Sequence, residues 1–273
     1  TVTSAEVAAL PTGLQASEAV PTILIVEDNA DISYYIGAQL QERYNLYYAQ
    51  NGEEGLERAK EVMPDLIITD LMMLNIDGLE LCREIRASEI LNHIPIIIIT
   101  AKSSEEDRIK GLAAGADAYL FKPFNTEELN IRVEKLLDSR RMLREKYSKA
   151  LQTGTEENVQ LSPNEQAFLN KLVDVVYSQI ATEKSDVETI ASMMCMSRSQ
   201  LNRKILSITG ENTTTYVIQI KLSKAKRLLD SPKDIPIGDI AMQCGFEDGA
   251  YFSRIFKQMF NMTPSQYRKR IKS

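Results

Sequence analysis

Five short, β-branched apolar runs alternate with amphipathic stretches through the first half of this chain. The runs span residues 23–26, 44–49, 66–69, 95–100 and 118–121, and the amphipathic stretches lie near 31–41, 53–62, 78–88, 104–114 and 126–138. Strands that alternate with helices predict a parallel, doubly wound sheet. The continuous apolar run Ile96–Ile99 is typical of a strand that helices cover on both faces. The first half is therefore expected to be an α/β domain with a five-stranded parallel sheet.

The second half reads as helix throughout, so an all-α domain is expected there. Helix-start signals stand at residues 162–165, 185–188, 197–200 and 263–266. This half also repeats itself at a spacing of 51 residues: Leu201, Arg203, Ile205, Gly210 and Tyr216 correspond to Phe252, Arg254, Phe256, Asn261 and Tyr267. Gly and Asn both tolerate the left-handed turn that ends a helix. The repeat predicts two helix-turn-helix units.

Composition along the chain suggests where the domains begin and end. Residues 1–20 are small and polar and are expected to be a linker, residues 21–138 the α/β domain, residues 139–161 a helical extension and linker, and residues 162–273 the helical domain. The α/β domain has 11 Lys and Arg against 22 Asp and Glu, a net charge of −11, whereas the helical domain has 16 against 11, a net charge of +5. An acidic domain suits a cation and a basic one suits phosphate.

Several classes of protein are disfavoured by the residues that are scarce. Three cysteines form no CxxC pair, and there is one histidine, His93, so a disulfide framework and a His-based metal site are not expected. The longest apolar run is strand-sized, so no membrane contact is expected from this segment. Reduced thiols and the lack of an export signal suit the cytoplasm. The chain begins with Thr1, which suggests a piece of a longer protein.

Polar side chains stand at the carboxyl ends of four predicted strands. They are Glu27 with Asp28, Asp70, Thr100 and Lys122. Ligands bind beyond the carboxyl ends of the strands in such a sheet. Three acidic groups in one pocket repel one another unless a cation lies among them, and Mg²⁺ suits oxygen ligands. We therefore predict that Asp70 is a phosphoryl acceptor, that Asp28, Asp70 and Glu27 bind the metal, and that Lys122 and Thr100 contact the phosphoryl oxygens.

The motifs around these side chains resemble the response-regulator receiver domain across residues 22–138. They are Ile25–Asn29, Ile68–Met73, Asp77–Gly78, Thr100–Lys102 and Lys122–Phe124. The resemblance implies that a histidine kinase, in cis or in trans, phosphorylates the chain. One departure is Leu74, which stands where that family usually has Pro. It is expected to loosen the loop beside the acceptor and to change how long the phosphate persists.

The same resemblance assigns roles to individual positions. Asp70 would accept the phosphoryl group, and the backbone carbonyl of Met72 would be a further ligand to Mg²⁺. Thr100 and Tyr119 would form the switch that reports phosphorylation. The Lys122–Pro123 peptide bond would be cis.

A recognition helix needs polar and basic residues on the face opposite its core face. With Leu201 and Ile205 facing inward, the first helix-turn-helix unit is expected to offer Arg198, Ser199, Asn202 and Arg203 to double-stranded DNA. With Phe252 and Phe256 inward, the second is expected to offer Gly249, Ala250, Ser253, Arg254 and Lys257. Gly249 and Ala250 have no side-chain donors, so this unit is expected to contact phosphate more than bases.

The helical half resembles the AraC-family DNA-binding domain over residues 165–271. The most specific matches are Ile240–Phe246, Tyr251–Lys257 and Thr263–Arg268. The resemblance implies two recognition helices in successive major grooves, about 34 Å apart, joined by a helix near residues 214–229.

Together the two halves predict a transcription regulator that phosphorylation controls, rather than an enzyme. A receiver followed by an AraC-type domain also resembles the C-terminal end of hybrid sensors. A homodimer after phosphorylation is expected, and RNA polymerase is a further candidate partner. Two alternatives stay open. A phosphatase of the haloacid-dehalogenase type also uses a strand-end Asp with Mg²⁺, but it needs a second Asp where this chain has Met72. The other is a receiver that serves only as a phosphate-independent dimerisation scaffold.

Overall fold

The computed structural model describes residues 20–101, 105–153, 159–181 and 186–272. Within these residues the chain divides into two compact units, and the boundary falls between Arg144 and Glu145. That boundary lies inside α5 (Thr126–Thr153), so the last turns of α5 belong to the second unit. The predicted linker at residues 1–20, apart from Val20, lies outside the described residues, as do residues 154–158 of the predicted extension and linker at 139–161.

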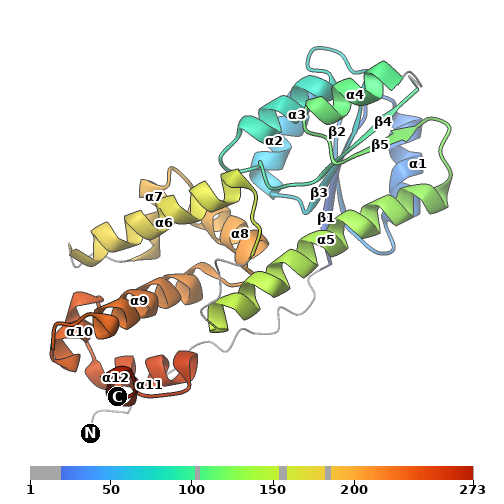
Figure 1. The fold of residues 1–273 in the computed structure, drawn as a ribbon. Helices are drawn as coiled ribbons and strands as arrows, with labels where there is room; N and C mark the ends of the chain where they lie inside the picture. Colours follow the sequence, from blue (N-terminus) through green and yellow to red (C-terminus); the bar gives the residue numbers. More distant parts are fainter. Residues whose placement is uncertain (1–19, 102–104, 154–158, 182–185, 273) are drawn as a thin grey trace, which may run out of the picture. The chain divides into compact units, whose positions relative to one another are not determined.

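The first unit is a five-stranded parallel sheet with helices on both faces (Figure 1). Its strands are β1 (Thr22–Val26), β2 (Asn45–Ala49), β3 (Leu66–Asp70), β4 (Ile96–Thr100) and β5 (Ala118–Phe121). The strand order is β2-β1-β3-β4-β5, and every pairing is parallel. The predicted α/β fold class is therefore confirmed.

Two hydrophobic cores hold the helices against this sheet. The helices are α1 (Ala30–Leu40), α2 (Gly52–Val62), α3 (Gly78–Ala87), α4 (Glu105–Ala113) and α5. Ile23 and Ile25 of β1 pack with α1 and α5, whereas Leu24 and Val26 pack with α2 and α3. Successive side chains of a strand point to opposite faces, so a strand that is apolar throughout is covered twice.

Side-chain caps fix where three of these helices begin. Asn29, Asn51 and Asp77 each accept a hydrogen bond from a backbone N–H in the first turn of α1, α2 and α3, respectively. The cap at Asp77 also places the start of α3 close to the end of β3. The Gly78 N–H donates to the Leu71 carbonyl at 3.1 Å. The chain therefore folds back tightly beside Asp70.

Gly78→Ala is expected to lower the free energy of unfolding by about 1–3 kcal/mol, since a methyl group has no room there. A Cβ at position 78 would lie 2.2 Å from the backbone oxygen of Asp70. Denaturant unfolding of the full chain measures the loss. Gly238→Ala is the matched control, because no atom lies within 4 Å of its Cβ position. Equal stability of the two variants would contradict the steric argument.

The second unit is helical, as predicted. After the end of α5 it contains α6 (Pro163–Ala181), α7 (Val187–Met193), α8 (Arg198–Thr209), α9 (Thr213–Asp230), α10 (Ile237–Gln243), α11 (Gly249–Phe260) and α12 (Pro264–Lys272). The pairs α7–α8 and α10–α11 are the two helix-turn-helix units, and α9 connects them. Gly210 and Asn261 end α8 and α11 in the left-handed conformation, with φ of 77° and 58°. The internal repeat is thus a structural repeat.

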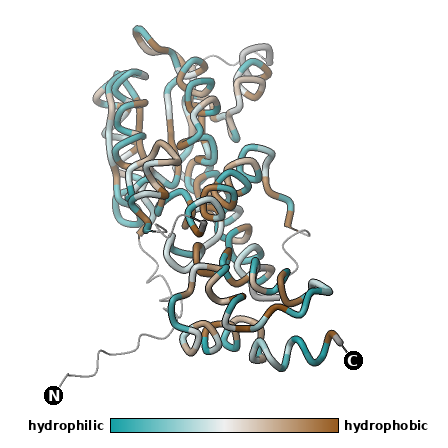
Figure 2. Tube along the Cα trace, turned by 90° about the vertical axis from the view of Figure 1, so that its left-hand side faces the viewer, coloured by the Kyte–Doolittle hydropathy of each residue, from teal (hydrophilic) through white to brown (hydrophobic). Residues whose placement is uncertain are grey.

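The helices of the second unit bury the apolar faces that the sequence predicts. Leu201, Ile205, Phe252 and Phe256 are fully buried. Hydrophilic and hydrophobic segments alternate along the helices (Figure 2), as amphipathic helices require. Within the described ranges, none of the helices is both long and apolar enough to cross a membrane.

At three of the four predicted helix starts, the structure has the capping bonds that the sequence pattern predicts. Reciprocal capping bonds join Ser162 to Glu165, Ser197 to Gln200 and Thr263 to Gln266. At the fourth, Asp186 is the residue that caps α7, through a bond from the Thr189 N–H. Ser185, which the sequence pattern placed at that cap, lies outside the described residues.

Candidate functional site

The strand-end carboxylates lie together at the carboxyl edge of the sheet. Glu27 and Asp28 follow β1, and Asp70 is the last residue of the neighbouring β3. One oxygen from each of the three carboxylates lies within 4.8 Å of the others. Glu27 and Asp70 are buried, whereas Asp28 is exposed. The three groups that the sequence singled out are therefore brought into one cluster with an open side.

Lys122 joins the two buried carboxylates. Its Nζ donates to Glu27 Oε2 at 2.8 Å and lies 2.9 Å from Asp70 Oδ1. The side chain of Lys122 is 18% exposed, against 2% for Glu27 and 8% for Asp70. The Lys122–Pro123 peptide bond is cis, as the resemblance implied. A single ammonium group thus bridges two carboxylates in a largely water-excluded position.

Burial and charge shift the acid–base properties of this pair. Burial raises the pKa of Glu27, and the Asp70 carboxylate adds to the rise, while the hydrogen bond from Lys122 opposes it. Burial alone would lower the pKa of Lys122, but its hydrogen bonds to Glu27 and Asp70 outweigh burial, so that its pKa is raised. Lys122 therefore carries a positive charge at neutral pH. That charge stabilises negative charge beside Asp70.

The loop after β3 shapes the surroundings of Asp70. The Met72 N–H donates to Asp70 Oδ2 at 3.2 Å, which orients the carboxylate. Leu74 is 77% exposed, so the residue that replaces the usual Pro lies on the surface of this loop. Asn75 has a positive φ of 68°, in the region that Asn tolerates better than most residues.

Thr100 and Tyr119 lie on the two strands beyond Asp70. Thr100 ends β4, one residue past Ile99, the register partner of Asp70, and it is fully buried. Tyr119 is 6% exposed and makes an edge-to-face contact with Phe121, with ring centroids 5.4 Å apart. A Cβ at Gly111 would meet the Tyr119 ring at 2.6 Å, so α4 passes close over this ring. The ring is therefore sensitive to movement of α4.

The residues predicted to contact DNA lie on α8 and α11. On α8, Arg198, Ser199 and Arg203 are exposed. On α11, Gly249, Ala250, Arg254 and Lys257 are exposed and Ser253 is half-buried. The Arg254 guanidinium lies over the Tyr251 ring, 5.4 Å from its centroid, which supports the side chain in an outward position.

Asn202 differs from the other predicted DNA contacts. Its Oδ1 accepts hydrogen bonds from the Thr213 N–H at 3.0 Å and from the Thr213 hydroxyl at 3.1 Å. Thr213 is the first residue of α9, and its N–H has no partner within that helix. The Asn202 side chain is therefore directed toward α9, away from the outward face of α8.

Asn202→Ala is expected to lower the free energy of unfolding by about 1–3 kcal/mol, because the buried Thr213 N–H would lose its acceptor. Thermal or urea unfolding measures the change. Ser199→Ala on the exposed face of α8 should stay within about 0.5 kcal/mol of wild type. A stability loss no larger than that of Ser199→Ala would show that the Asn202 side chain does not support α9.

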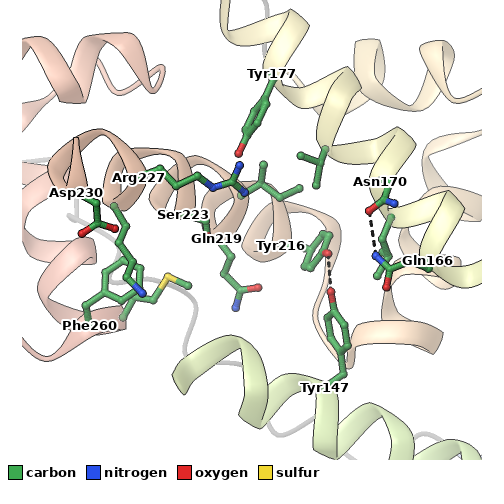
Figure 3. A pocket seen from close by; sticks show the side chains of 15 residues that line it. Tyr147, Gln166, Asn170, Tyr177, Tyr216, Gln219, Ser223, Arg227, Asp230 and Phe260 are labelled. Carbon is green, nitrogen blue, oxygen red and sulfur yellow. Dashed lines mark hydrogen bonds between the residues drawn. The ribbon is translucent and has the colours of Figure 1, made fainter. Parts of the chain in front are cut away.

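The contact between the end of α5 and α9 was missed by the sequence reasoning. The Tyr147 and Tyr216 hydroxyls are buried and lie 3.1 Å apart (Figure 3). The Ser148 hydroxyl donates to Glu211 Oε1 at 3.3 Å. Burial raises the pKa of Glu211, and the hydrogen bonds from Ser148 and Gln219 oppose that rise. The apolar pattern marks Tyr216 as a packing residue, but its partner on α5 has no sequence signal.

Comparison with known proteins agrees with both halves of this description. Residues 23–134 match the response regulator receiver domain family, and residues 190–270 match a helix-turn-helix domain family. The chain carries a response regulator receiver domain and an AraC-type helix-turn-helix domain. The receiver domain contains the carboxylate cluster, and the helix-turn-helix domain contains α8 and α11.

Individual relatives cover either both domains or one. Histidine kinase P4 of Formosa agariphila is 36% identical over 249 residues, which are 91% of this chain and 18% of that protein. Response regulator ArlR of Staphylococcus saprophyticus is 47% identical over 116 residues, 42% of this chain and 51% of that protein. This chain thus spans about a fifth and about half, respectively, of these relatives. A solved receiver domain from a sensor histidine kinase of Pseudomonas aeruginosa, with a magnesium ion in its active-site cleft, is 34% identical, with a TM-score of 0.42, and covers 44% of this chain and 99% of its own.

Proposed function

We propose that this chain is a transcription regulator that phosphorylation of Asp70 controls. The observation that carries the proposal is the position of Lys122, whose ammonium group joins the buried Asp70 and Glu27 carboxylates beside the exposed Asp28. A buried carboxylate held next to a fixed positive charge is arranged for negative charge to develop on an incoming phosphoryl group. Both matched domain families support this reading.

The carboxylate cluster fits a magnesium ion. Its donors are oxygen atoms, and their mutual repulsion leaves a need for positive charge. Asp28 and Asp70 would hold the ion with Glu27 beside them, and the backbone carbonyl of Met72 would be a further ligand. The bound ion neutralises charge on the transferring phosphoryl group. Lys122 would contact the phosphoryl oxygens.

Phosphoryl transfer to this chain needs a partner that supplies the group. In the proposed reaction, a phosphohistidine of a histidine kinase, in cis or in trans, loses its P–N bond as Asp70 forms a new P–O bond. The Thr100 hydroxyl then contacts the phosphoryl oxygens, and Tyr119 responds from its position under α4. This change would favour a homodimer or release the DNA-binding domain.

Double-stranded DNA is the proposed target of the second domain. Arg198, Ser199 and Arg203 of α8 would read base edges in one major groove. On α11, Ser253, Arg254 and Lys257 would chiefly contact phosphates in the next groove, while Gly249 and Ala250 let the backbone approach closely. Asn202 is left out of this set because it supports α9. RNA polymerase is a further proposed partner, and the cytoplasm is the proposed compartment.

An enzyme of the haloacid-dehalogenase type is a weaker reading. That chemistry needs a second carboxylate two residues after the nucleophile, where this chain has the exposed thioether of Met72. A scaffold that functions without phosphate would not need the buried Lys122 bridge, which costs desolvation of three charged groups.

The decisive test measures DNA affinity with and without phosphorylation. DNA sites are selected from a random pool with the wild-type chain, and affinity is followed by fluorescence anisotropy. Mg²⁺ and acetyl phosphate are expected to change wild-type affinity by about tenfold or more, a coupling typical of such switches. Asp70→Asn should show no change, and Arg203→Ala should bind weakly in both states. A wild-type chain that is phosphorylated yet binds DNA with unchanged affinity would refute phosphate control.

A further inference from the structure

The second domain contains a cavity of about 420 Å³ between the end of α5 and helices α6, α9 and α11 (Figure 3). This volume lies within the range of small-molecule sites in proteins. One face of α9 supplies much of its wall through Tyr216, Gln219, Ser223, Lys226, Arg227 and Asp230. A helix face that is turned toward other helices is usually apolar. The polar residues on this face of α9 therefore suggest that it contacts something other than an apolar core.

Gln219 supplies a buried acceptor in this cavity. The side chain is 9% exposed, and its amide nitrogen donates to the Glu211 carboxylate. Its Oε1 atom is buried and has no hydrogen-bond partner among the described residues. Figure 3 shows the side chain projecting from α9 into the open space above Tyr147. Buried acceptors are normally satisfied, so a donor from a bound molecule suits this position.

Two adjacent cations, Lys226 and Arg227, also line the cavity. In the described part of the chain, no carboxylate lies within salt-bridge distance of either side chain. Lys226 Nζ lies over the Phe260 ring, 5.5 Å from its centroid, and Arg227 extends toward the hydroxyl of Tyr177 (Figure 3). The nearby Asp230 accepts a hydrogen bond from the Tyr267 hydroxyl at 3.0 Å. A guanidinium group beside aromatic rings favours a carboxylate on a planar molecule.

We propose that this cavity binds a small hydroxylated organic acid. Its carboxylate pairs with Arg227, with Lys226 adding positive charge, and its hydroxyl donates to Gln219 Oε1. The body of the ligand lies among the rings of Tyr177, Tyr216 and Phe260. Because Tyr147 of α5 and α9 both line the site, an occupant contacts the helix that connects the two helix-turn-helix units. The ligand is thus an input to the DNA-binding domain that is separate from phosphorylation.

Isothermal titration of the full chain with 4-hydroxybenzoate tests this proposal. We expect saturable binding that Arg227→Gln and Gln219→Met each weaken by about tenfold or more, the effect of losing one strong polar contact. Benzoate lacks the hydroxyl and 4-hydroxybenzamide lacks the carboxylate, so both should bind wild type more weakly by a similar factor. Lys60→Gln on α2 removes the same charge outside the cavity and should bind like wild type. Circular dichroism and thermal melting confirm that each variant is folded.

Several outcomes would overturn the proposal. One is the absence of saturable binding at millimolar 4-hydroxybenzoate, and another is equal affinity in wild type and the folded Arg227→Gln variant. A third is a loss of DNA affinity and of its salt dependence in Arg227→Gln without any ligand binding, which would assign these cations to DNA phosphate. The titration uses neither DNA nor a phosphodonor. Its result is therefore independent of the proposed phosphorylation at Asp70.

Discussion

Asp70→Asn is expected to abolish phosphoryl incorporation when the full chain is incubated with Mg²⁺ and acetyl phosphate. The wild-type chain should gain one phosphoryl group, which intact-mass spectrometry detects. The reason is chemical, because an amide oxygen is a far weaker nucleophile than a carboxylate oxygen. The replacement has nearly the same shape, but its single oxygen can accept from either the Met72 N–H or Lys122, which contact different oxygens of Asp70. The loss of incorporation would follow from the missing nucleophile, and one of these two contacts would be lost with it.

Asp77→Asn is the matched control for this experiment. It makes the same chemical change in the same loop, and Asn retains the capping bond at the start of α3. This variant should be phosphorylated like wild type. Incorporation that persists in Asp70→Asn, at another residue found by peptide mapping, would move the acceptor away from β3. A folded wild-type chain that gains no phosphoryl group would favour the scaffold reading.

The sheet and its carboxyl-end cluster could be predicted because each depends on local pattern. Residues 96–99 are apolar on both faces, which requires helices on each side of the strand. Once five such strands are parallel, the residues that follow them meet at one edge. Glu27, Asp70 and Lys122 therefore come together even though they are far apart in the sequence.

The helical domain shows where a sequence pattern stops being sufficient. Periodicity places Leu201 and Ile205 in the core, and both are buried. Asn202 lies at the border of that face, where the helix rotation alone allows either an inward or an outward side chain. The start of α9 determines the direction of the Asn202 side chain, because the Thr213 N–H needs an acceptor. A tertiary contact of this kind cannot be predicted from the pattern of the neighbouring residues.

The packing of the end of α5 is a second tertiary contact that the sequence pattern does not predict. The sequence predicts a helical extension and linker over residues 139–161, and the helix ends at Thr153. Periodicity does not reveal that its last turns pack with α9, since the partner of Tyr147 is 69 residues away. Hydrogen bonds between hydroxyl groups depend on three-dimensional placement. The cavity beside Tyr147 could not be predicted for the same reason.

Lys122→Met is expected to impair both stability and phosphorylation. The replacement keeps most of the length of the side chain but leaves Glu27 and Asp70 buried next to each other without the ammonium group. Breaking a buried charge pair in this way costs on the order of 3 kcal/mol in the free energy of unfolding. The rate of phosphoryl incorporation should fall by about 10²–10³, as when one preorganised donor is removed from a transition state. Lys60→Met on the exposed face of α2 should leave the phosphorylation rate unchanged and lower the free energy of unfolding by at most about 1 kcal/mol.

Mg²⁺ should recover part of the lost stability of Lys122→Met. An ion that binds the folded state stabilises it by RT ln(1 + [L]/Kd), so tighter binding gives a larger increment. Without the Lys122 charge, the carboxylates repel one another more strongly and attract a cation more strongly. Urea unfolding in EDTA and in Mg²⁺ should therefore show a larger Mg²⁺ increment for Lys122→Met than for wild type. Equal increments would mean that the ion binds away from Glu27 and Asp70. Equal stability in EDTA would mean instead that the Lys122 bridge contributes little to the fold.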